Sequence, residues 1–360
     1  MSSHPDVLIL GGGVIGLTCA YFLARDGVHV EVVDKGDFGQ EASWAGAGIL
    51  VPGSISHARS PGELLHAHGV GMFPALSAEL RERTGIDNGY LRCGGLEIVR
   101  PGEPVTREWR GEGVACELLD DKALERKEPL LAAKGTVYLL PEMAQIRNPR
   151  HLKALLAACA ASRVSMRSGC PVHGFERAGG RVASVRSGDE TLIAGKYLVA
   201  AGAWTEGLLG SLGLRLGIHP VRGQIALLNT RTPRIRHVVM LGKLYMVQRP
   251  DGRLLVGSTE ENAGFDKSTT AGAIGDLLQF ACSLLPLSDA TLERCWAGLR
   301  PGSPDGLPYL GPVSGLTNLF VAAGHFRSGI QMSPATGLLM KELLLGQPTT
   351  LPLEPFRLDR

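Results

Sequence analysis

Hydrophobic positions follow two periods along this chain, and the alternation between them predicts strands and helices in turn. Residues 7–10 form a short apolar run typical of a buried strand, 17–25 have the spacing of an amphipathic helix, and 28–33 have the pattern of a second strand. Helical spacing returns at 63–83, 122–128, 151–162 and 271–285. Strand-like runs lie at 91–99, 115–119, 135–140, 164–166, 172–175, 182–186, 192–193, 219–228, 244–248 and 253–259, with two more beginning at 196 and 319.

Turn residues mark several ends of these elements. Gly85 ends the helix predicted over 63–83, and Asp251-Gly252 joins two alternating runs as a hairpin. Residues 101–104 begin and end with proline and are predicted to form a loop.

The order of these elements predicts an α/β fold. We expect a Rossmann-like dinucleotide-binding domain with an interleaved, mostly antiparallel α+β substrate domain. The chain enters the substrate domain twice. The predicted segments are 1–85, 146–218 and 297–360 for the first domain, and 86–145 and 219–296 for the second.

A glycine-rich turn follows the first predicted strand. Gly11, Gly13 and Gly16 form G-x-G-x-x-G where a helix should begin, and the unpaired N–H groups of a helix start suit a diphosphate. Asp34 ends the next strand, about 20 residues on, where a ribose hydroxyl is bound in such folds. An acid there disfavours the extra phosphate of NADP, but these residues alone leave NAD and FAD open.

Composition excludes several classes of protein. The formal net charge of +2 in 360 residues argues against general nucleic-acid binding. Seven scattered cysteines without C-x-x-C predict neither a disulfide framework nor a metal site, and reduced thiols favour a cytoplasmic location. No apolar run approaches the length of a membrane span. A homo-oligomer is compatible with the sequence, which does not decide the oligomeric state.

Two further stretches carry candidate chemistry. Residues 41–50 are rich in Ala, Gly and Ser, which suits either a backbone lying flat against a planar ligand or a close-packed helix start or loop. Arg300 lies between Leu299 and Pro301 in a segment with few other charges. A buried guanidinium needs an anionic partner, which could be a substrate carboxylate or an internal acid such as Asp305.

Several motifs together resemble the glycine oxidase and D-amino-acid oxidase family of FAD-dependent oxidoreductases. They are G-G-G-V-I-G at 11–16, V-V-D-K-G at 32–36, A-S-W-A-G-A-G-I-L at 42–50, G-L-R-P at 298–301 and G-H-F-R-S-G-I at 324–330, and the resemblance covers nearly the whole chain. It implies non-covalent FAD, because Cys295 is displaced from the position at which some relatives attach the flavin. The residues that the resemblance, together with the glycine motif, assigns to FAD are Gly11, Gly13, Val14, Ile15, Gly16, Asp34, Lys35, Ala42, Ser43, Ala47, Gly48, Ile49, Val172, His325, Phe326, Arg327, Ser328, Gly329, Ile330 and Gln331.

The resemblance also implies a substrate site. Arg300 would bind the carboxylate of an amino acid, helped by Arg327 and Tyr245; a half-buried core tyrosine is the weaker alternative for Tyr245. Glu260 is expected to be solvated together with Glu261, outside the site. No catalytic acid or base and no metal ligand is predicted.

The function that the resemblance implies is oxidative deamination. Glycine or another small primary or secondary amino acid would give an oxo acid (glyoxylate from glycine), ammonia and hydrogen peroxide with O₂ as acceptor, a reaction that supplies thiamine thiazole synthesis in many bacteria. One alternative is a D-amino-acid or sarcosine-type dehydrogenase that passes electrons to a quinone or carrier. Others are a non-catalytic flavin-binding subunit of a larger assembly and a nicotinamide dehydrogenase. Nothing in the sequence decides between glycine, sarcosine and a D-amino acid.

Overall fold

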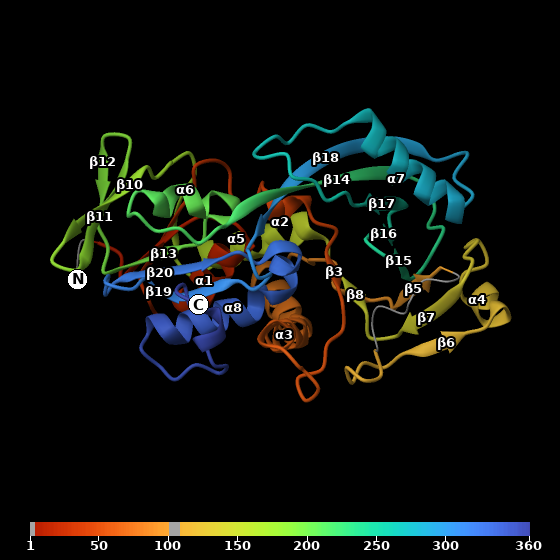
Figure 1. Cartoon of the computed structure of the whole chain (residues 1–360), viewed down its shortest axis with the longest axis horizontal. Helices are drawn as coiled ribbons and strands as arrows, with labels where there is room; N and C mark the ends of the chain where they lie inside the picture. Colours follow the sequence, from red (N-terminus) through yellow and green to blue (C-terminus); the bar gives the residue numbers. More distant parts are fainter. Residues whose placement is uncertain (1–3, 101–108) are drawn as a thin grey trace.

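The computed structural model describes residues 4–100 and 109–360, so the loop predicted over 101–104 lies outside the described residues. Within the described ranges two large sheets lie side by side, joined by two long strands (Figure 1). One is six-stranded, in the order β19-β20-β13-β1-β2-β9, and parallel except for β19. Its strands are β1 (Val7–Leu10), β2 (Val30–Val33), β9 (Ser165–Arg167), β13 (Lys196–Val199), β19 (Tyr309–Pro312) and β20 (Leu319–Ala323).

Both faces of the six-stranded sheet are covered, which explains its continuous apolar strands. Ile9 and Leu198 face a helical layer, whereas Leu8 and Val199 pack toward a small three-stranded sheet on the other side. The helical layer is α1 (Val14–Arg25), α5 (Asn148–Ala161) and α8 (Gly329–Leu344), with α3 (Pro61–Thr84) packed beyond it. The small sheet is β10 (Gly174–Ala178), β11 (Arg181–Ser187) and β12 (Glu190–Leu192).

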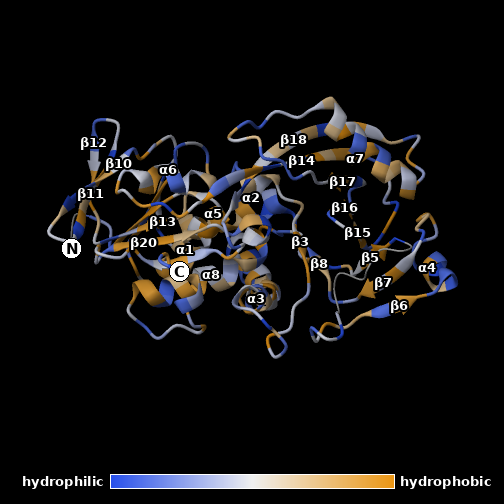
Figure 2. Cartoon of the chain, viewed as in Figure 1, coloured by the Kyte–Doolittle hydropathy of each residue, from blue (hydrophilic) through white to orange (hydrophobic). Residues whose placement is uncertain are grey.

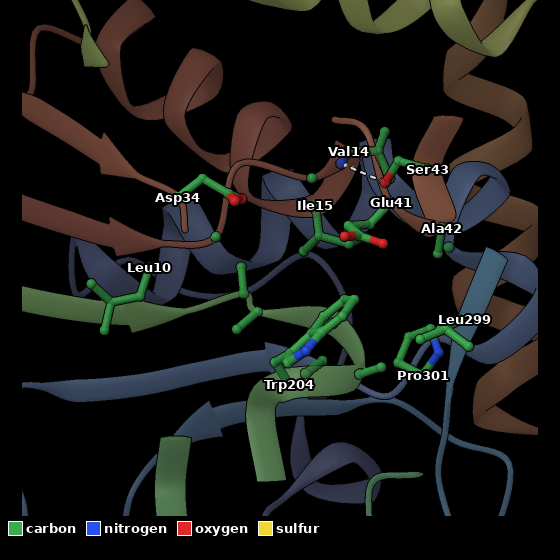
Figure 3. Close-up of a pocket in the computed structure, with 18 of the residues that line it drawn as sticks. Leu10, Val14, Ile15, Asp34, Glu41, Ala42, Ser43, Trp204, Leu299 and Pro301 are labelled. Carbon is green, nitrogen blue, oxygen red and sulfur yellow. Dashed lines mark hydrogen bonds between the residues drawn. The ribbon is translucent and has the colours of Figure 1, made fainter. Parts of the chain in front are cut away.

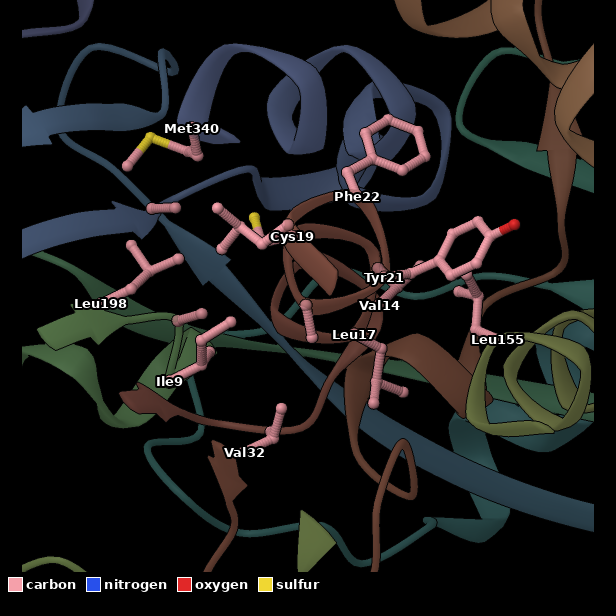
Figure 4. Close-up of a cluster of buried hydrophobic side chains, with 14 of the residues drawn as sticks. Ile9, Val14, Leu17, Cys19, Tyr21, Phe22, Val32, Leu155, Leu198 and Met340 are labelled. Atoms are coloured by element: carbon pink, nitrogen blue, oxygen red, sulfur yellow. The ribbon is translucent and has the colours of Figure 1, made fainter. Parts of the chain in front are cut away.

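Helix α1 differs from the amphipathic helix that its sequence predicts. Every residue from Gly16 to Leu23 is buried, because the sheet, α5 and α8 enclose it on several sides. Figure 4 shows Cys19 of α1 between the sheet residues Leu198 and Ile9 and Met340 of α8. An enclosed helix has no solvated stripe, so the predicted amphipathic character is wrong although the helix itself is present.

The second sheet has eight strands in the described residues, in the order β18-β14-β17-β16-β15-β5-β7-β6. Helices α7 (Ala271–Leu284) and α4 (Asp121–Lys127) pack against it. Its strands come from two separate parts of the chain, and the predicted domain boundaries stay a prediction. The strands are β5 (Gly95–Val99), β6 (Glu117–Leu119), β7 (Thr136–Leu140), β14 (His219–Asn229), β15 (Val238–Leu241), β16 (Leu244–Gln248), β17 (Arg253–Gly257) and β18 (Thr291–Gly302).

Strands β14 and β18 connect the two halves of the molecule. They pair antiparallel from His219 opposite Gly302 to Asn229 opposite Thr291, and they run from the first sheet out to the second (Figure 1). The sequence analysis did not predict a strand over Thr291–Gly302, and this strand crosses the boundary predicted at 296/297. Arg300 therefore lies on a rigid strand at the junction of the two halves.

Smaller elements fill the junction. A short sheet has the order β3-β8-β4, from β3 (Ile49–Leu50), β8 (Ala144–Gln145) and β4 (Leu91–Arg92). The other helical elements of the described residues are α2 (Ala42–Ala45), α6 (Thr205–Gly210), η1 (Gly202–Trp204), η2 (Phe326–Ser328) and η3 (Glu354–Phe356).

Hydropathy follows this layering. The strands of the six-stranded sheet are strongly hydrophobic, whereas the outlying helix α4 is largely hydrophilic (Figure 2). The helix end at Gly85, which is left-handed with φ of 70°, and the hairpin of β16 and β17 confirm those predictions. A parallel sheet between two layers, beside a mostly antiparallel sheet, confirms the predicted α/β fold class.

Candidate active site

A cavity of about 510 Å³ opens at the carboxyl ends of the parallel strands. Leu10, Val33, Ala200 and Ala323 line it, and each lies at or directly after the end of a strand. Ligands bind at this edge in doubly wound sheets because loops and helix N-termini converge there. Figure 3 shows Leu10 and Asp34 on one side of the cavity and the Trp204 ring inside it.

The glycine turn forms one wall of this cavity. A Cβ atom on Gly11, whose φ is +115°, would lie 2.4 Å from the Ala200 carbonyl oxygen, and one on Gly16 would lie 1.9 Å from the Gly11 carbonyl oxygen. Both glycines are required by close backbone packing. Gly13 lines the cavity itself, and the Val14 N–H donates to Ser43 Oγ at 2.9 Å. The positive end of α1 therefore faces space that suits an anionic group.

Asp34 is held at the cavity edge by backbone donors. Its carboxylate accepts from the N–H groups of Gly12 at 2.7 Å and Gly36 at 2.9 Å. Lys35 lies beside it, with Nζ 3.3 Å from the centre of the Trp204 ring. The sequence analysis assigned no role to Trp204, yet its ring lies inside the cavity.

The small-residue segment forms helix α2 and then continues extended along the cavity. Three alternate carbonyl groups are held from behind by side chains distant in sequence. Asn148 Nδ2 donates to the carbonyl of residue 43 at 2.9 Å, Trp296 Nε1 to that of residue 45 at 3.0 Å, and Arg249 Nη2 to that of residue 47 at 2.7 Å. The backbone is thus braced on one side and exposed to the cavity on the other.

A second cavity, of about 580 Å³, continues from the first. The two share lining residues and together form one long cleft between the sheets; the shared residues are Ala42, Gly46, Arg300, Arg327 and Ile330. A cleft with a glycine cradle and a helix N-terminus at one end, and a braced backbone further along, fits an extended dinucleotide.

Nearly all of the predicted site residues line this cleft. Gly16 is the exception among them, because it packs beneath the turn. The first cavity has Gly11, Gly13, Val14, Ile15, Asp34, Lys35, Ala42, Ser43, Val172, His325, Phe326, Arg327, Gly329, Ile330 and Arg300. The second has Ala47, Gly48, Ile49, Ser328, Gln331 and Tyr245, and shares Ala42, Arg300, Arg327 and Ile330.

Arg300 reaches the cleft without a carboxylate partner in the described part of the chain. Its Nη2 donates to Ser258 Oγ at 2.7 Å, and Nη1 donates to the Thr259 carbonyl at 3.2 Å. Burial lowers the pKa of Arg300 below its ordinary value. The internal acid considered from the sequence, Asp305, instead pairs with Arg360 at 2.7 Å. The guanidinium is therefore available for an anionic ligand.

Glycines make room for the guanidinium and for its neighbour Tyr245. A Cβ on Gly223 of β14 would lie 2.2 Å from Arg300 Nη2, and one on Gly257 of β17 would lie 2.5 Å from the Tyr245 hydroxyl. Tyr245 is half-buried; it packs against a core cluster and also lines the second cavity. Its position is therefore compatible with a core tyrosine and with a residue that contacts a ligand. Burial raises the pKa of Tyr245, so the hydroxyl stays protonated at neutral pH.

Arg327 has a partner that the sequence analysis placed outside the site. Glu260 forms an ion pair with Arg327, and its second oxygen accepts from Lys243 Nζ at 3.1 Å. Glu261 points elsewhere and pairs with the buried Arg222 at 2.6 Å. Glu260 is exposed, as expected, but it is paired, whereas Glu261 is partly buried, so the two carboxylates have different partners.

His325, which the sequence assigns to the cofactor, is held as a neutral side chain in the cleft. His325 is buried and hydrogen-bonded to Thr336 Oγ1 at 3.0 Å, and burial lowers its pKa to about 3. It therefore stays neutral. The described residues contain no cluster of three or more His, Cys, Asp or Glu side chains suited to a metal ion. No helix among residues 4–100 and 109–360 has the length and apolar character needed to cross a membrane.

Comparisons with known proteins agree with this geometry. The family model described as DAO, FAD dependent oxidoreductase, matches residues 6–343. Glycine oxidase of Pseudomonas putida is 38% identical over 98% of this chain and 97% of its own length. The crystal structure of glycine oxidase from Geobacillus kaustophilus superposes with a TM-score of 0.92 at 33% identity, covering 100% of this chain and 99% of that one.

Two further relatives have other names. The hydrogen cyanide synthase subunit HcnC of Pseudomonas aeruginosa is 34% identical over 99% of this chain and 96% of its own length. The bifunctional protein ThiO/ThiG of Nostoc sp. is 32% identical over 99% of this chain and 55% of its own length. Similarity of this kind therefore extends to proteins with different overall roles.

Proposed function

Since the chain belongs to the DAO family of FAD-dependent oxidoreductases, we propose that it oxidatively deaminates glycine or another small primary or secondary amino acid. It is an FAD-dependent enzyme of the amino-acid oxidase type. For glycine the balanced reaction takes up O₂ and water and gives glyoxylate, ammonia and hydrogen peroxide. FAD, when bound, supplies the two-electron acceptor for the substrate.

The residues that would hold FAD follow the cleft from end to end. The N-terminus of α1 and the glycine turn suit the diphosphate, and Asp34, fixed by two backbone donors, suits a ribose hydroxyl. The braced segment 42–49 and the turn 325–331 line the part of the cleft that contains Arg300. That arrangement supports a flavin ring held between the two backbone segments.

One observation carries the proposal for the substrate. Arg300 is a largely buried guanidinium whose contacts in the described chain are neutral oxygens, and it lies where both cavities meet. A buried cation is costly without an anion, and a planar carboxylate can accept two parallel hydrogen bonds from it. The protonated hydroxyl of Tyr245 lines the same space and can donate a further hydrogen bond.

The protein contributes mainly by orienting the substrate. A carboxylate fixed on a rigid strand leaves few orientations for the α-carbon and amine, and fixed orientation alone supports large rate enhancements. The neutral His325 is committed to Thr336 and is not needed as a base.

A second candidate is an amino-acid dehydrogenase that passes electrons to a quinone or carrier, or a flavin-binding subunit of a larger assembly. The observation that favours it is the full-length similarity to HcnC, which is named as a subunit. The similarity to ThiO/ThiG supports supply of an oxidised glycine to thiamine thiazole synthesis. A cytoplasmic location stays a prediction from the cysteine content.

Anaerobic mixing tests the proposal. Purified, FAD-loaded protein is mixed with glycine, sarcosine and a panel of D- and L-amino acids while flavin absorbance is followed, and oxygen is then admitted and peroxide measured. We expect bleaching by at least one small amino acid, followed by stoichiometric peroxide. Bleaching without peroxide would favour the dehydrogenase, and the absence of bleaching by the whole panel would rule out an amino-acid oxidase.

A further inference from the structure

The two arginines of the cleft differ in their partners. Arg300 contacts the Ser258 hydroxyl and the Thr259 carbonyl, which are neutral, whereas Arg327 forms an ion pair with the carboxylate of Glu260. Both guanidiniums line both cavities. A ligand that enters the cleft therefore meets two guanidiniums. That of Arg300 has no carboxylate partner among the described residues, whereas that of Arg327 is already paired with Glu260.

Glu260 is held in place from two sides. It follows β17 after Ser258 and Thr259, and its other oxygen accepts from Lys243 in the tight turn between β15 and β16. Burial tends to raise the pKa of Glu260, but the hydrogen bonds from Arg327 and Lys243 outweigh it, and the pKa stays below its ordinary value. Glu260 is thus ionised at neutral pH and brings one full negative charge to Arg327.

We propose that Glu260 is a specificity-determining residue: by serving as the built-in counter-ion of Arg327, it leaves one guanidinium for the substrate and selects amino acids with a single carboxylate over those with two. This inference rests on the proposed function, because it concerns the substrate class of the same site. It also concerns a position at which the sequence analysis predicted no role.

The physical reason is charge matching. A second substrate carboxylate that approached Arg327 would have to displace Glu260 or lie beside it, and two neighbouring carboxylates repel each other. An amino acid with one carboxylate satisfies Arg300 without meeting this repulsion. Discrimination between the two classes of amino acid would therefore come from repulsion by Glu260 as much as from attraction by Arg300.

The test removes the negative charge of Glu260 and keeps the shape of its side chain. Glu260→Gln frees Arg327 and Lys243 for a second carboxylate. With FAD-loaded protein, kcat/KM is measured for two matched pairs, D-alanine with D-aspartate and sarcosine with N-carboxymethylglycine. We expect the ratio of dicarboxylate to monocarboxylate to rise at least tenfold in at least one pair, the size of effect that one charge-assisted hydrogen bond provides.

A binding measurement makes the test independent of turnover. Acetate and malonate are titrated into the FAD-loaded proteins and their Kd values read from the flavin spectrum. Glu260→Gln should raise the affinity for malonate relative to acetate at least tenfold. Glu293→Gln is the matched control, since Glu293 pairs with Arg253 on the outer part of the same sheet, and it should leave both ratios unchanged.

The outcomes separate the two proposals. If no amino acid reduces the wild-type flavin, the proposed function fails, while the acetate and malonate titrations still decide the role of Glu260. If wild-type protein oxidises glycine but the ratios do not move in Glu260→Gln, or if wild-type protein already prefers the dicarboxylates, the inference about Glu260 is wrong and the proposed function stands.

Discussion

Replacing Arg300 by methionine isolates the guanidinium that we assign to the substrate carboxylate. Methionine keeps an unbranched apolar stem on β18 and removes the charge. In the free protein the guanidinium donates to Ser258 Oγ at 2.7 Å and to the Thr259 carbonyl at 3.2 Å, and burial lowers its pKa. The protein therefore keeps a desolvated cation whose described partners are neutral, and only a bound anion compensates for it fully.

The magnitude follows from the hydrogen bonds that a carboxylate would make. Two charge-assisted hydrogen bonds at roughly 1.5–3 kcal/mol each amount to about 3–6 kcal/mol. At about 1.4 kcal/mol per factor of ten, Arg300→Met should lower kcat/KM for the best substrate by roughly 10²–10⁴. The FAD content should not change, because the diphosphate and ribose positions lie at the other end of the cleft.

Stability provides an independent signature. Removing a buried cation that has no carboxylate partner relieves several kcal/mol of desolvation. This gain offsets the loss of its hydrogen bonds to Ser258, Thr259 and Arg222, of about 1 kcal/mol each. The free energy of unfolding, measured by urea titration of the FAD-loaded protein, should therefore stay within about 1 kcal/mol of wild type or rise. A cation kept at a cost in stability is typical of a functional site.

The assay compares Arg300→Met with Arg294→Met. Arg294 lies on the same strand but is exposed and stacks on the Trp44 ring, so its loss should leave kcat/KM nearly unchanged. The reasoning is refuted if Arg300→Met retains kcat/KM within tenfold of wild type. It is also refuted if that variant loses more than about 2 kcal/mol of stability, because the guanidinium would then be a structural brace.

Three further predictions concern the surroundings of this site. Gly223→Ala places a Cβ 2.2 Å from the substrate-binding guanidinium and should lower kcat/KM at least tenfold, whereas Gly272→Ala, which meets nothing within 4 Å, should not. Arg249→Met removes the brace on the carbonyl of residue 47 and should raise the FAD Kd about tenfold, as measured by fluorescence of released flavin. Burial lowers the pKa of His151 to about 4 and of His325 to about 3, so protonation below pH 6.5 favours the unfolded state. Stability should be full above pH 6.5 and fall by about 2 kcal/mol per histidine at pH 5, and urea unfolding of His151→Phe should show about half of that loss.

Much of the first half of the cleft could be predicted from local sequence. Gly11 and Gly16 are required by close backbone contacts within one strand–turn–helix unit, and Asp34 ends the adjacent strand, so spacing alone brings them together. The helix end at Gly85 and the hairpin at Asp251-Gly252 are equally local. Periodicity and backbone conformation act over a few residues, which is why the sequence predicted them.

The choice of charge partners depended on the tertiary structure. Asp305 is five residues from Arg300 yet pairs with Arg360, and Glu260 pairs with Arg327, which is 67 residues away. An ion pair forms only within a few ångströms, and sequence distance does not report that separation across a fold. For the same reason the sequence could not show that Glu260 is the partner of Arg327.

The sequence by itself determined the dinucleotide turn, because it is a local pattern with a local physical cause. That the small-residue segment and the two arginine motifs belong to the same site was implied by the family resemblance. Only the tertiary structure decided how the small-residue segment is held and which arginine remains available. Asn148, Trp296 and Arg249 reach the segment from three distant elements, and their hydrogen bonds exist only once both sheets are packed together. The charge of the site is likewise a property of the packed molecule, since it depends on which carboxylate lies within reach of which guanidinium.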